Sequence, residues 1–322
     1  NRSVQSVKVV PTNYGVTPTF SGNVVTVPIP HWGKYELQIN GSEESPLYLC
    51  ANPPEEPAPT GQNVTVYGPG IHFPGRKTLP AGSTVWLQAG SVVHGSFVVP
   101  NADCTIRGRG ILTNTLSSGQ HFLETSGTRF RYEGILLNDS TPFNIRLPNA
   151  SFGTIDNVKI FSHRNNSDGI DPTSAHDILI TNCLLRNWDD AITLKSDPGG
   201  PNYNITVRGC FLATDFGWRS FGFGAEGGNE SYNVLMENCD IMHAHSKHCF
   251  NTETPNNPLI RDWIIRNVRI ENFHGYSLTG LDSASRAILL EGRIRNILFE
   301  NVAFTGPQMP SGLHGDIDGV TF

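Results

Sequence analysis

The chain has 322 residues with a formal net charge of −6, and charged residues make up only 16% of it. A nucleic-acid-binding protein would normally be basic, so we expect no nucleic-acid partner. No uninterrupted apolar run reaches the about 18 residues of a membrane-spanning helix. The 33 glycines and 22 prolines favour many short strands and turns over long helices.

The chain starts at Asn1 without a Met or an apolar leader, so we expect a processed chain whose signal peptide has been removed. Frequent Asn-X-Ser/Thr sequons predict a secreted, extracellular glycoprotein. They begin at Asn1, Asn40, Asn63, Asn138, Asn149, Asn165, Asn204 and Asn229. The six cysteines permit disulfides, but the sequence does not choose among the pairings.

Residues 1–75 contain the short apolar segments VKVVP, NVVTVPIP, YELQIN, PLYLC and VTVYG. Gly, Pro and Asn residues separate these segments, as in the stretch ANPPEEPAPTGQN. Such a pattern is typical of short antiparallel strands. We therefore predict a small N-terminal β-sandwich over residues 1–75, without catalytic residues.

Residues 76–322 contain a repeat, in segments such as IDNVKIFSH, ITNCLLRNW and MENCDIMHA. One buried position recurs at intervals of 23 to 34 residues, which indicates a solenoid. It is filled by Ile111, Ile135, Val158, Cys183, Cys210, Cys239, Val268 and Val302. Each unit holds short β segments and no helical period, so we predict an all-β fold, a parallel β-helix. A β-propeller would need longer and more even repeats.

The residue before the recurring position is usually asparagine, and we expect these amides to form a hydrogen-bonded ladder along the coil. The asparagines are Asn157, Asn182, Asn238, Asn267 and Asn301. Gly134 and Gly209 are the exceptions. The stacked cysteines are interpreted as small buried apolar residues, although a disulfide between adjacent rungs, such as Cys183–Cys210, is also possible.

The segments after the repeat position can be aligned as DGIDPT, DAITLK, FGFGAE and HCFNTE. This alignment stacks Asp168 on Asp190, with Asp189 one residue earlier. A first column is then Asp168, Asp190, Phe221 and His248; a second is Asp171, Thr193, Gly224 and Asn251; a third is Thr173, Lys195, Glu226 and Glu253. Asp189 reaches the face of Asp190 only if the chain bends between them.

Adjacent carboxyl groups cannot all ionise, so one of them keeps a proton at working pH. That group can protonate a leaving oxygen while an ionised neighbour activates water, which is the chemistry of glycoside hydrolysis. The alternative is that the aspartates cap turns or bind a cation. We expect Asp168, Asp189 and Asp190 to be catalytic.

NSDGID followed by DDAITLKS resembles the NTDG and DD motifs of glycoside hydrolase family 28, the polygalacturonases. The resemblance implies a right-handed parallel β-helix. The GHG motif of that family has no counterpart, because Arg219 or Ser220 stands where the His would fall. Asn251 and Glu253 replace the Arg and Lys of its RIK motif, which argues against a galacturonate substrate.

The architecture also resembles glycoside hydrolase family 49, the dextranases and isopullulanases, in which a β-sandwich precedes the β-helix. The stretch SYNVLMENCDIMHAH is similar to the segment that follows the active-site rungs of that family. Together the two resemblances imply inverting hydrolysis of an α-linked polysaccharide. They cover residues 75–305 well and the first domain loosely.

Several residues near the aspartates are expected to contact substrate or to pack locally. They are Asp171, Trp188, Lys195, Trp218, Arg219, Glu226, His248, Asn251 and Glu253. Lys195 and Glu226 can alternatively pair with each other across rungs. His243, His245 and His248 lack a convincing ligand set, so no metal site is predicted.

The sequence thus predicts a secreted, inverting endo-glycoside hydrolase that acts on a neutral α-linked polysaccharide. We expect a monomer without a cofactor. The competing hypotheses are a polygalacturonase-like pectin hydrolase, a non-catalytic β-helix that binds carbohydrate, and a polysaccharide lyase that holds Ca²⁺ on the aspartates. Linkage, endo or exo action, and the assignment of acid and base are not defined by the sequence.

Overall fold

The computed structural model describes residues 3–43, 45–114, 119–196, 200–224, 226, 228–242, 245–252, 257–275, 285–306 and 309–322. The chain forms two compact units, Asn1–Glu56 and Pro57–Phe322. In the described ranges, β-strands predominate, and no helix is long and apolar enough to cross a membrane.

The first unit contains two small antiparallel sheets. Its elements are β1 (Val7–Val10), η1 (Thr12–Tyr14), β2 (Thr19–Ser21), β3 (Val24–Thr26), β4 (Gly33–Ile39) and β5 (Leu47–Ala51). The order β1-β4-β5 forms one sheet, and β2 pairs with β3 in the other. Val9, Tyr35 and Leu37 form its buried core, which explains the alternating apolar pattern of the sequence.

The second unit begins earlier than the predicted boundary after residue 75. β6 (Val64–Tyr67) pairs in parallel with β8 (Thr84–Leu87), and β7 (Gly70–Thr78) pairs in parallel with β9 (Ser91–Val99). Strands of the segment assigned to the sandwich therefore form the first rung of the solenoid. VTVYG has the same alternation of apolar and polar residues as the earlier strands. Its sequence therefore does not indicate that it pairs with the solenoid, because pairing depends on tertiary contacts.

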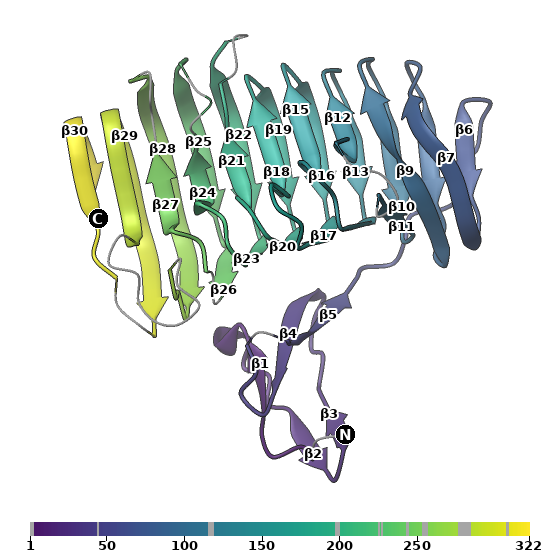
Figure 1. The fold of residues 1–322 in the computed structure, drawn as a ribbon, viewed down its shortest axis with the longest axis horizontal. Helices are drawn as coiled ribbons and strands as arrows, with labels where there is room; N and C mark the ends of the chain where they lie inside the picture. The colour runs from purple at the N-terminus through teal and green to yellow at the C-terminus, as the bar shows by residue number, and fades with distance from the viewer. Residues whose placement is uncertain are drawn as a thin grey trace. The chain divides into compact units, whose positions relative to one another are not determined.

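The second unit is a parallel β-helix, as predicted, and its 25 strands form one continuous sheet that winds along the solenoid (Figure 1). In the middle of the coil each rung has three strands, so that a strand pairs with the one three places later. The remaining strands are β10 (Thr105–Gly108), β11 (Ile111–Thr113), β12 (Leu123–Thr125), β13 (Arg131–Glu133), β14 (Leu136–Asn138), β15 (Ile145–Pro148), β16 (Ser151–Asp156), β17 (Lys159–Ser162), β18 (Ile170–Thr173), β19 (His176–Thr181), β20 (Leu184–Asn187), β21 (Ile192–Leu194), β22 (Asn202–Arg208), β23 (Phe211–Thr214), β24 (Arg219–Phe223), β25 (Ser231–Glu237), β26 (Asp240–Met242), β27 (His248–Thr252), β28 (Leu259–Glu271), β29 (Arg286–Thr305) and β30 (Gly312–Thr321).

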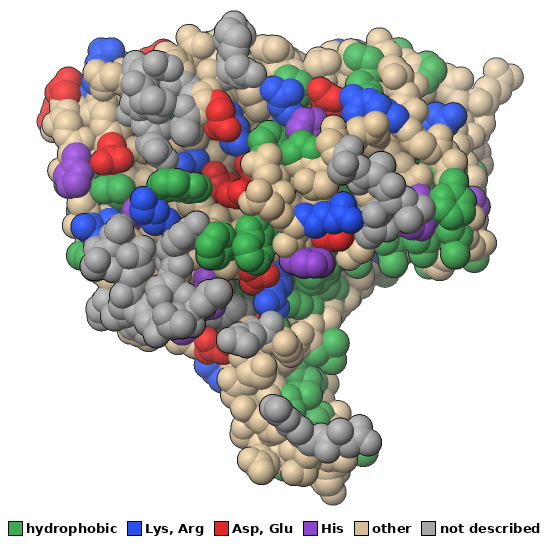
Figure 2. All heavy atoms as spheres, viewed as in Figure 1, with side chains coloured by type: hydrophobic (Ala, Val, Ile, Leu, Met, Phe, Trp, Pro, Cys, Tyr) green, Lys and Arg blue, Asp and Glu red, His purple; other side chains and the backbone are tan. Residues whose placement is uncertain are grey.

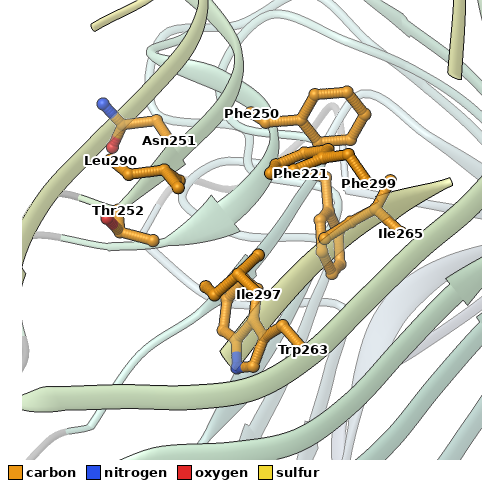
Figure 3. Close-up of a pocket in the computed structure, with 9 residues that line it drawn as sticks. All are labelled: Phe221, Phe250, Asn251, Thr252, Trp263, Ile265, Leu290, Ile297 and Phe299. Atoms are coloured by element: carbon orange, nitrogen blue, oxygen red, sulfur yellow. The ribbon is translucent and has the colours of Figure 1, made fainter. Parts of the chain in front are cut away.

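The interior of the coil is a column of stacked apolar side chains. The recurring positions from Ile135 to Val268 are buried, and Val302 packs against the same core. This interior contains a void of about 10 Å³. Figure 3 shows three of the side chains that line it, Phe221, Phe250 and Phe299, with their rings close together. Such a void is at the lower limit of the space that one water needs, so this part of the core is tightly packed.

Each asparagine of the predicted ladder has a positive φ. Asn301 Nδ2 donates to Asn267 Oδ1 at 2.8 Å, whereas Asn182 Nδ2 donates to Asp156 Oδ1 at 2.9 Å. The ladder is therefore mixed, with aspartate as one of its acceptors. All six cysteines are free thiols, as the packing interpretation of the cysteine column requires.

A second ladder bends the strands β19, β22, β25, β28 and β29. It consists of Asp177, Asn204, Asn233, Asp262 and Asn296, all with positive φ. Asn204 Nδ2 donates to Asp177 Oδ1 at 2.9 Å, and Asn233 Nδ2 donates to Asn204 Oδ1 at 2.5 Å. Sequence analysis missed this ladder, because its asparagines and aspartates interrupt segments that otherwise alternate as one strand.

Candidate active site

The strand register places Asp168 and Asp190 on adjacent rungs. Ile170 is the partner of Ile192, and the N–H of Gly169 donates to the carbonyl oxygen of Asp190 at 2.8 Å. Both aspartates lie just before their strands and are buried. The predicted stacking of the two carboxylates is therefore present in the structure.

The predicted continuation of this column is wrong by two residues. Ile192 is the partner of Phe221, which is buried in the core, so Arg219 follows Asp190 in the column. Arg219 is in turn the partner of His248, and His248 is the partner of Arg286. The column thus changes from two carboxylates to basic side chains along the coil.

The same shift corrects the second and third columns. Gly222, and not Gly224, is the partner of Asn251. Thr173 forms a bridge with Lys195 as predicted. Glu226 does not share their register, although its Oε1 lies 3.4 Å from Lys195 Nζ. Glu253 lies outside the described residues.

Lys195 joins two carboxylates of the neighbouring rung. Its Nζ lies 2.8 Å from Asp168 Oδ2 and 3.2 Å from Asp171 Oδ2. Burial, together with the Asp171 charge, raises the pKa of Asp168 well above its ordinary value, although Lys195 opposes the shift. Burial also raises the pKa of Asp171 to about 6. Burial alone would lower the pKa of Lys195, but the Asp171 and Asp168 carboxylates raise it instead.

Asp190 is held differently, by three hydrogen-bond donors. The backbone N–H groups of Trp218 and Arg219 both donate to Asp190 Oδ1 at 2.9 Å. The Arg219 guanidinium donates to Asp190 Oδ2, also at 2.9 Å. The guanidinium is the charged donor of the three, and a charge-assisted hydrogen bond is stronger than a neutral one.

Asp189 is only half-buried, and a bend separates it from Asp190 as the prediction required. Asn187 Nδ2 donates to the carbonyl oxygens of both Asp189 and Asp190, at 2.6 and 2.8 Å. Gly217 lies against this bend, where a Cβ would come within 2.3 Å of the Asp189 carbonyl carbon. Burial and the charge of Asp190 raise the pKa of the Asp189 carboxyl. Sequence analysis missed Asn187 and Gly217.

The residues downstream of the carboxylates are basic or aromatic. His248 is buried, and burial followed by the charges of Lys247 and Arg219 lowers its pKa to about 4. Trp218 is 44% exposed, and Lys247 Nζ lies 4.0 Å from its ring centroid. Asn251 is also buried. These residues form one flank of the site.

The upstream flank is aromatic and was not predicted. Phe143 lies 4.1 Å from Lys195 Nζ, measured to its ring centroid, and stacks on His121 with a centroid separation of 5.1 Å. Burial lowers the pKa of His121 to about 4, so its ring is neutral near pH 7. Trp188 stacks on Phe216 with a centroid separation of 4.8 Å.

Charges of both signs are interspersed on the face in Figure 2. Within the part of the chain that the structure describes, no group of three or more His, Cys, Asp or Glu side chains is arranged to hold a metal ion. The candidate site is therefore a carboxylate cluster whose charges are compensated by protein cations, Lys195 and Arg219.

The sequence around this site matches the model of a known family. Residues 108–252 match the model of Glycosyl hydrolases family 28. The family 28-like segment includes Asp168, Asp189 and Asp190, and the predicted resemblance is confirmed. The match supports a glycoside hydrolase. Among curated proteins, none matches the chain.

Solved structures share the fold of this family 28-like chain at low sequence identity. An exopolygalacturonase from Thermotoga maritima is 15% identical, with a TM-score of 0.56, over 80% of this chain and 84% of its own. Dex49A from Penicillium minioluteum is 14% identical, with a TM-score of 0.60, over 99% and 72%. An alginate lyase from Paenibacillus is 15% identical, with a TM-score of 0.54, over 74% and 88%. These likenesses show the right-handed parallel β-helix fold.

Proposed function

We propose that the protein is an inverting endo-glycoside hydrolase that cleaves a neutral α-linked polysaccharide, with Asp168, Asp189 and Asp190 as its catalytic residues. The observation that carries this proposal is that the bend at Asn187–Asp190 brings the half-buried Asp189 next to a carboxylate with three donors. Inverting hydrolysis needs one protonated and one ionised carboxyl group.

The surroundings of Asp189 and Asp190 are the basis for assigning the acid and the base. The raised pKa of Asp189 favours a proton on this group, and its partial exposure lets it reach a glycosidic oxygen. Asp190 accepts hydrogen bonds from Arg219 and from two backbone N–H groups, and we assign it the role of base. In the proposed step, Asp189 protonates the leaving oxygen as the glycosidic C–O bond breaks. Water bonds to the anomeric carbon and loses its proton to Asp190, while Asp168 orients it.

The substrate preference follows from the engaged cations. Lys195 contacts Asp168 and Asp171, and Arg219 contacts Asp190, so neither is available to a uronate without leaving a buried carboxylate unpaired. Asn251 stands where a galacturonate hydrolase of family 28 would present an arginine. A neutral sugar needs no cation, and the aspartates and Asn251 can bind its hydroxyl groups.

A polygalacturonase-like activity is the second candidate, and two cations favour it. Lys247 lies over Trp218, and Arg286 follows His248 in the column. Both are partly exposed, unlike Lys195 and Arg219. A uronate bound on this flank would need them, because a carboxylate requires a charge partner when it leaves water.

Release of reducing ends from dextran, pullulan, nigeran and polygalacturonate, measured side by side, tests the proposal. We expect turnover of at least one neutral α-glucan and little of polygalacturonate. Turnover of polygalacturonate alone, reduced in Lys247→Met and Arg286→Met, would replace the proposal with the second candidate. The size distribution of early products tests endo action.

A polysaccharide lyase and a non-catalytic binding protein would give different signals. A lyase would release unsaturated products and would lose activity with EDTA until Ca²⁺ is restored, whereas we expect EDTA to leave the rate unchanged. A carbohydrate-binding protein without turnover would bind the glucan and release no reducing ends. We also propose a secreted extracellular glycoprotein that is a monomer, which glycan analysis of the native protein and light scattering would test.

A further inference from the structure

A second pocket lies outside the carboxylate cluster, on the strands β14, β17 and β20. Its volume is about 260 Å³, and it is lined by Asn138, Phe161, Ser162, His163, Arg186 and Asp215. Nothing in the proposed hydrolysis uses these residues. Along the chain, the 163–169 and 188–191 segments separate β17 and β20 from β18 and β21, the strands that follow the aspartates.

The strand register builds the floor of this pocket. Asn138, Phe161 and Arg186 are successive partners in parallel strands, so their side chains lie in one outward-facing column. The next partner in this column is Ala213, whose methyl group leaves room beside Arg186. Arg186 accordingly reaches Asp215, with its Nε 3.1 and 3.2 Å from the two carboxylate oxygens.

The charges around the pocket are balanced. Arg186 pairs with Asp215 on one side. On the other side, Arg164 Nε lies 3.0 Å from Asp139 Oδ2, and His163 Nδ1 lies 3.3 Å from Asp139 Oδ1. An anionic ligand would have to compete with these carboxylates for the guanidinium groups. A neutral ligand with hydroxyl groups can instead bind both members of the pair, donating to Asp215 and accepting from Arg186.

The remaining features fit a sugar ring. Phe161 is partly exposed at the centre of the column and offers an apolar face, while His163 is largely exposed at the rim. The volume is below the about 300–1,000 Å³ of pockets for drug-sized ligands, so it suits one small ring. An apolar wall with a few placed polar groups is the usual composition of a small-molecule site.

We propose that this pocket is a second carbohydrate-binding site that holds one neutral pyranose unit of a polysaccharide. The choice of a sugar as the ligand class rests on the proposed function. Arg186 precedes Asp189 by only three positions in the chain, so a polysaccharide held here stays close to the carboxylate cluster. Binding at the pocket would raise the local concentration of glycosidic bonds at the aspartates.

Stoichiometry of oligosaccharide binding tests the proposal. Isomaltotriose and maltotriose are titrated by calorimetry into the Asp189→Asn variant, which removes the proposed acid. We expect two sites per chain for at least one of them. Adding Phe161→Ala or Arg186→Ala should leave one site, with the other weakened at least tenfold, or by about 1.4 kcal/mol. Circular dichroism checks that each variant is folded.

Phe152→Ala is the matched control, because Phe152 is 58% exposed on β16, outside the pocket, and should keep two sites. His163→Ala changes an exposed rim residue with little risk to folding and should weaken only the second site. A single site in the Asp189→Asn parent, or two sites in both pocket variants, would overturn the proposal. Trigalacturonate that occupies the pocket in place of the glucans would overturn the ligand class.

The proposed function can fail separately. If the wild-type protein releases no reducing ends but the pocket variants lose one site, the hydrolase proposal fails and the second site stands. If the wild type cleaves a glucan but the parent variant has a single site, the pocket proposal fails alone.

Discussion

Asp168 and Asp190 lie one rung apart in the same column, yet the two carboxylates have different charge and hydrogen-bond partners. Asp168 shares the Lys195 ammonium with Asp171, and burial raises its pKa. Asp190 has its own guanidinium and two N–H donors. One cation for two buried carboxylates favours proton uptake by that pair, whereas Asp190 alone accepts hydrogen bonds from three donors. Repetition of a rung therefore places the two carboxylates in one column, and their different partners distinguish them.

The largest expected effect comes from removing the cation of each carboxylate. We expect Arg219→Met to lower the free energy of unfolding by about 3–5 kcal/mol, because it leaves a charge buried without its partner. We expect Lys195→Met to cost less near pH 5, where Asp168 and Asp171 can take up protons, and more as the pH rises. Urea unfolding at pH 5 and pH 8 measures both, and equal losses at both pH values would contradict the difference between the two carboxylates.

The second prediction concerns rate. We expect Asp190→Asn to keep the fold, because its amide oxygen can still accept the two backbone N–H groups, and to lose at least about a hundredfold in rate. Asp103→Asn, which changes an exposed carboxylate paired with Arg129, is the control and should keep full activity. Steady-state hydrolysis of the preferred glucan is the measurement. A folded Asp190→Asn protein with full activity would remove Asp190 from the mechanism.

The smallest effect is a change in the pH dependence of stability. The pKa of Asp171 is about 6 in the folded protein, above its unfolded value, so the folded state binds the proton more tightly. This group's stabilising contribution is therefore complete below the unfolded pKa of about 4 and is lost as the pH rises towards 6. We expect Asp171→Asn to remove this decline, on the order of 2 kcal/mol. The measurement is the urea concentration at the unfolding midpoint between pH 4 and 7. If it changes with pH in the same way in the wild type and in Asp171→Asn, the prediction is wrong.

The sequence predicts the solenoid well because burial repeats along it. Val158 and Cys183 fill equivalent interior positions, and the rung between them contains no long inserted loop. For the same reason the stacking of Asp168 on Asp190 could be predicted. The boundary of the first unit could not be predicted, because the sequence of a single strand such as β6 does not indicate which strand it pairs with.

The rung after Asp190 shows where prediction fails. Phe221 and Phe223 are two residues apart and both buried, so either could continue the interior column. The loop before them decides the register, and its length is not fixed by any repeat. Because of the two-residue shift, Arg219 and not Phe221 lies beside Asp190 in the column. The hydrophobic pattern of the segment could not indicate the ion pair that results. The contact between Lys195 and Asp171 was likewise missed, because it joins neighbouring columns as well as neighbouring rungs.

The second ladder has a consequence for the sugar-attachment signals of this chain. Asn204 belongs to an Asn-Ile-Thr sequon, but its amide nitrogen donates to Asp177 and its amide oxygen accepts from Asn233. Asn40, in another sequon, donates to the Ser3 carbonyl and accepts from the N–H of Gln5. An oligosaccharyltransferase needs that nitrogen accessible, before or after folding. In the folded protein the side-chain amides of Asn40 and Asn204 are thus held in hydrogen bonds, whereas Asn63 and Asn149 are exposed at the surface.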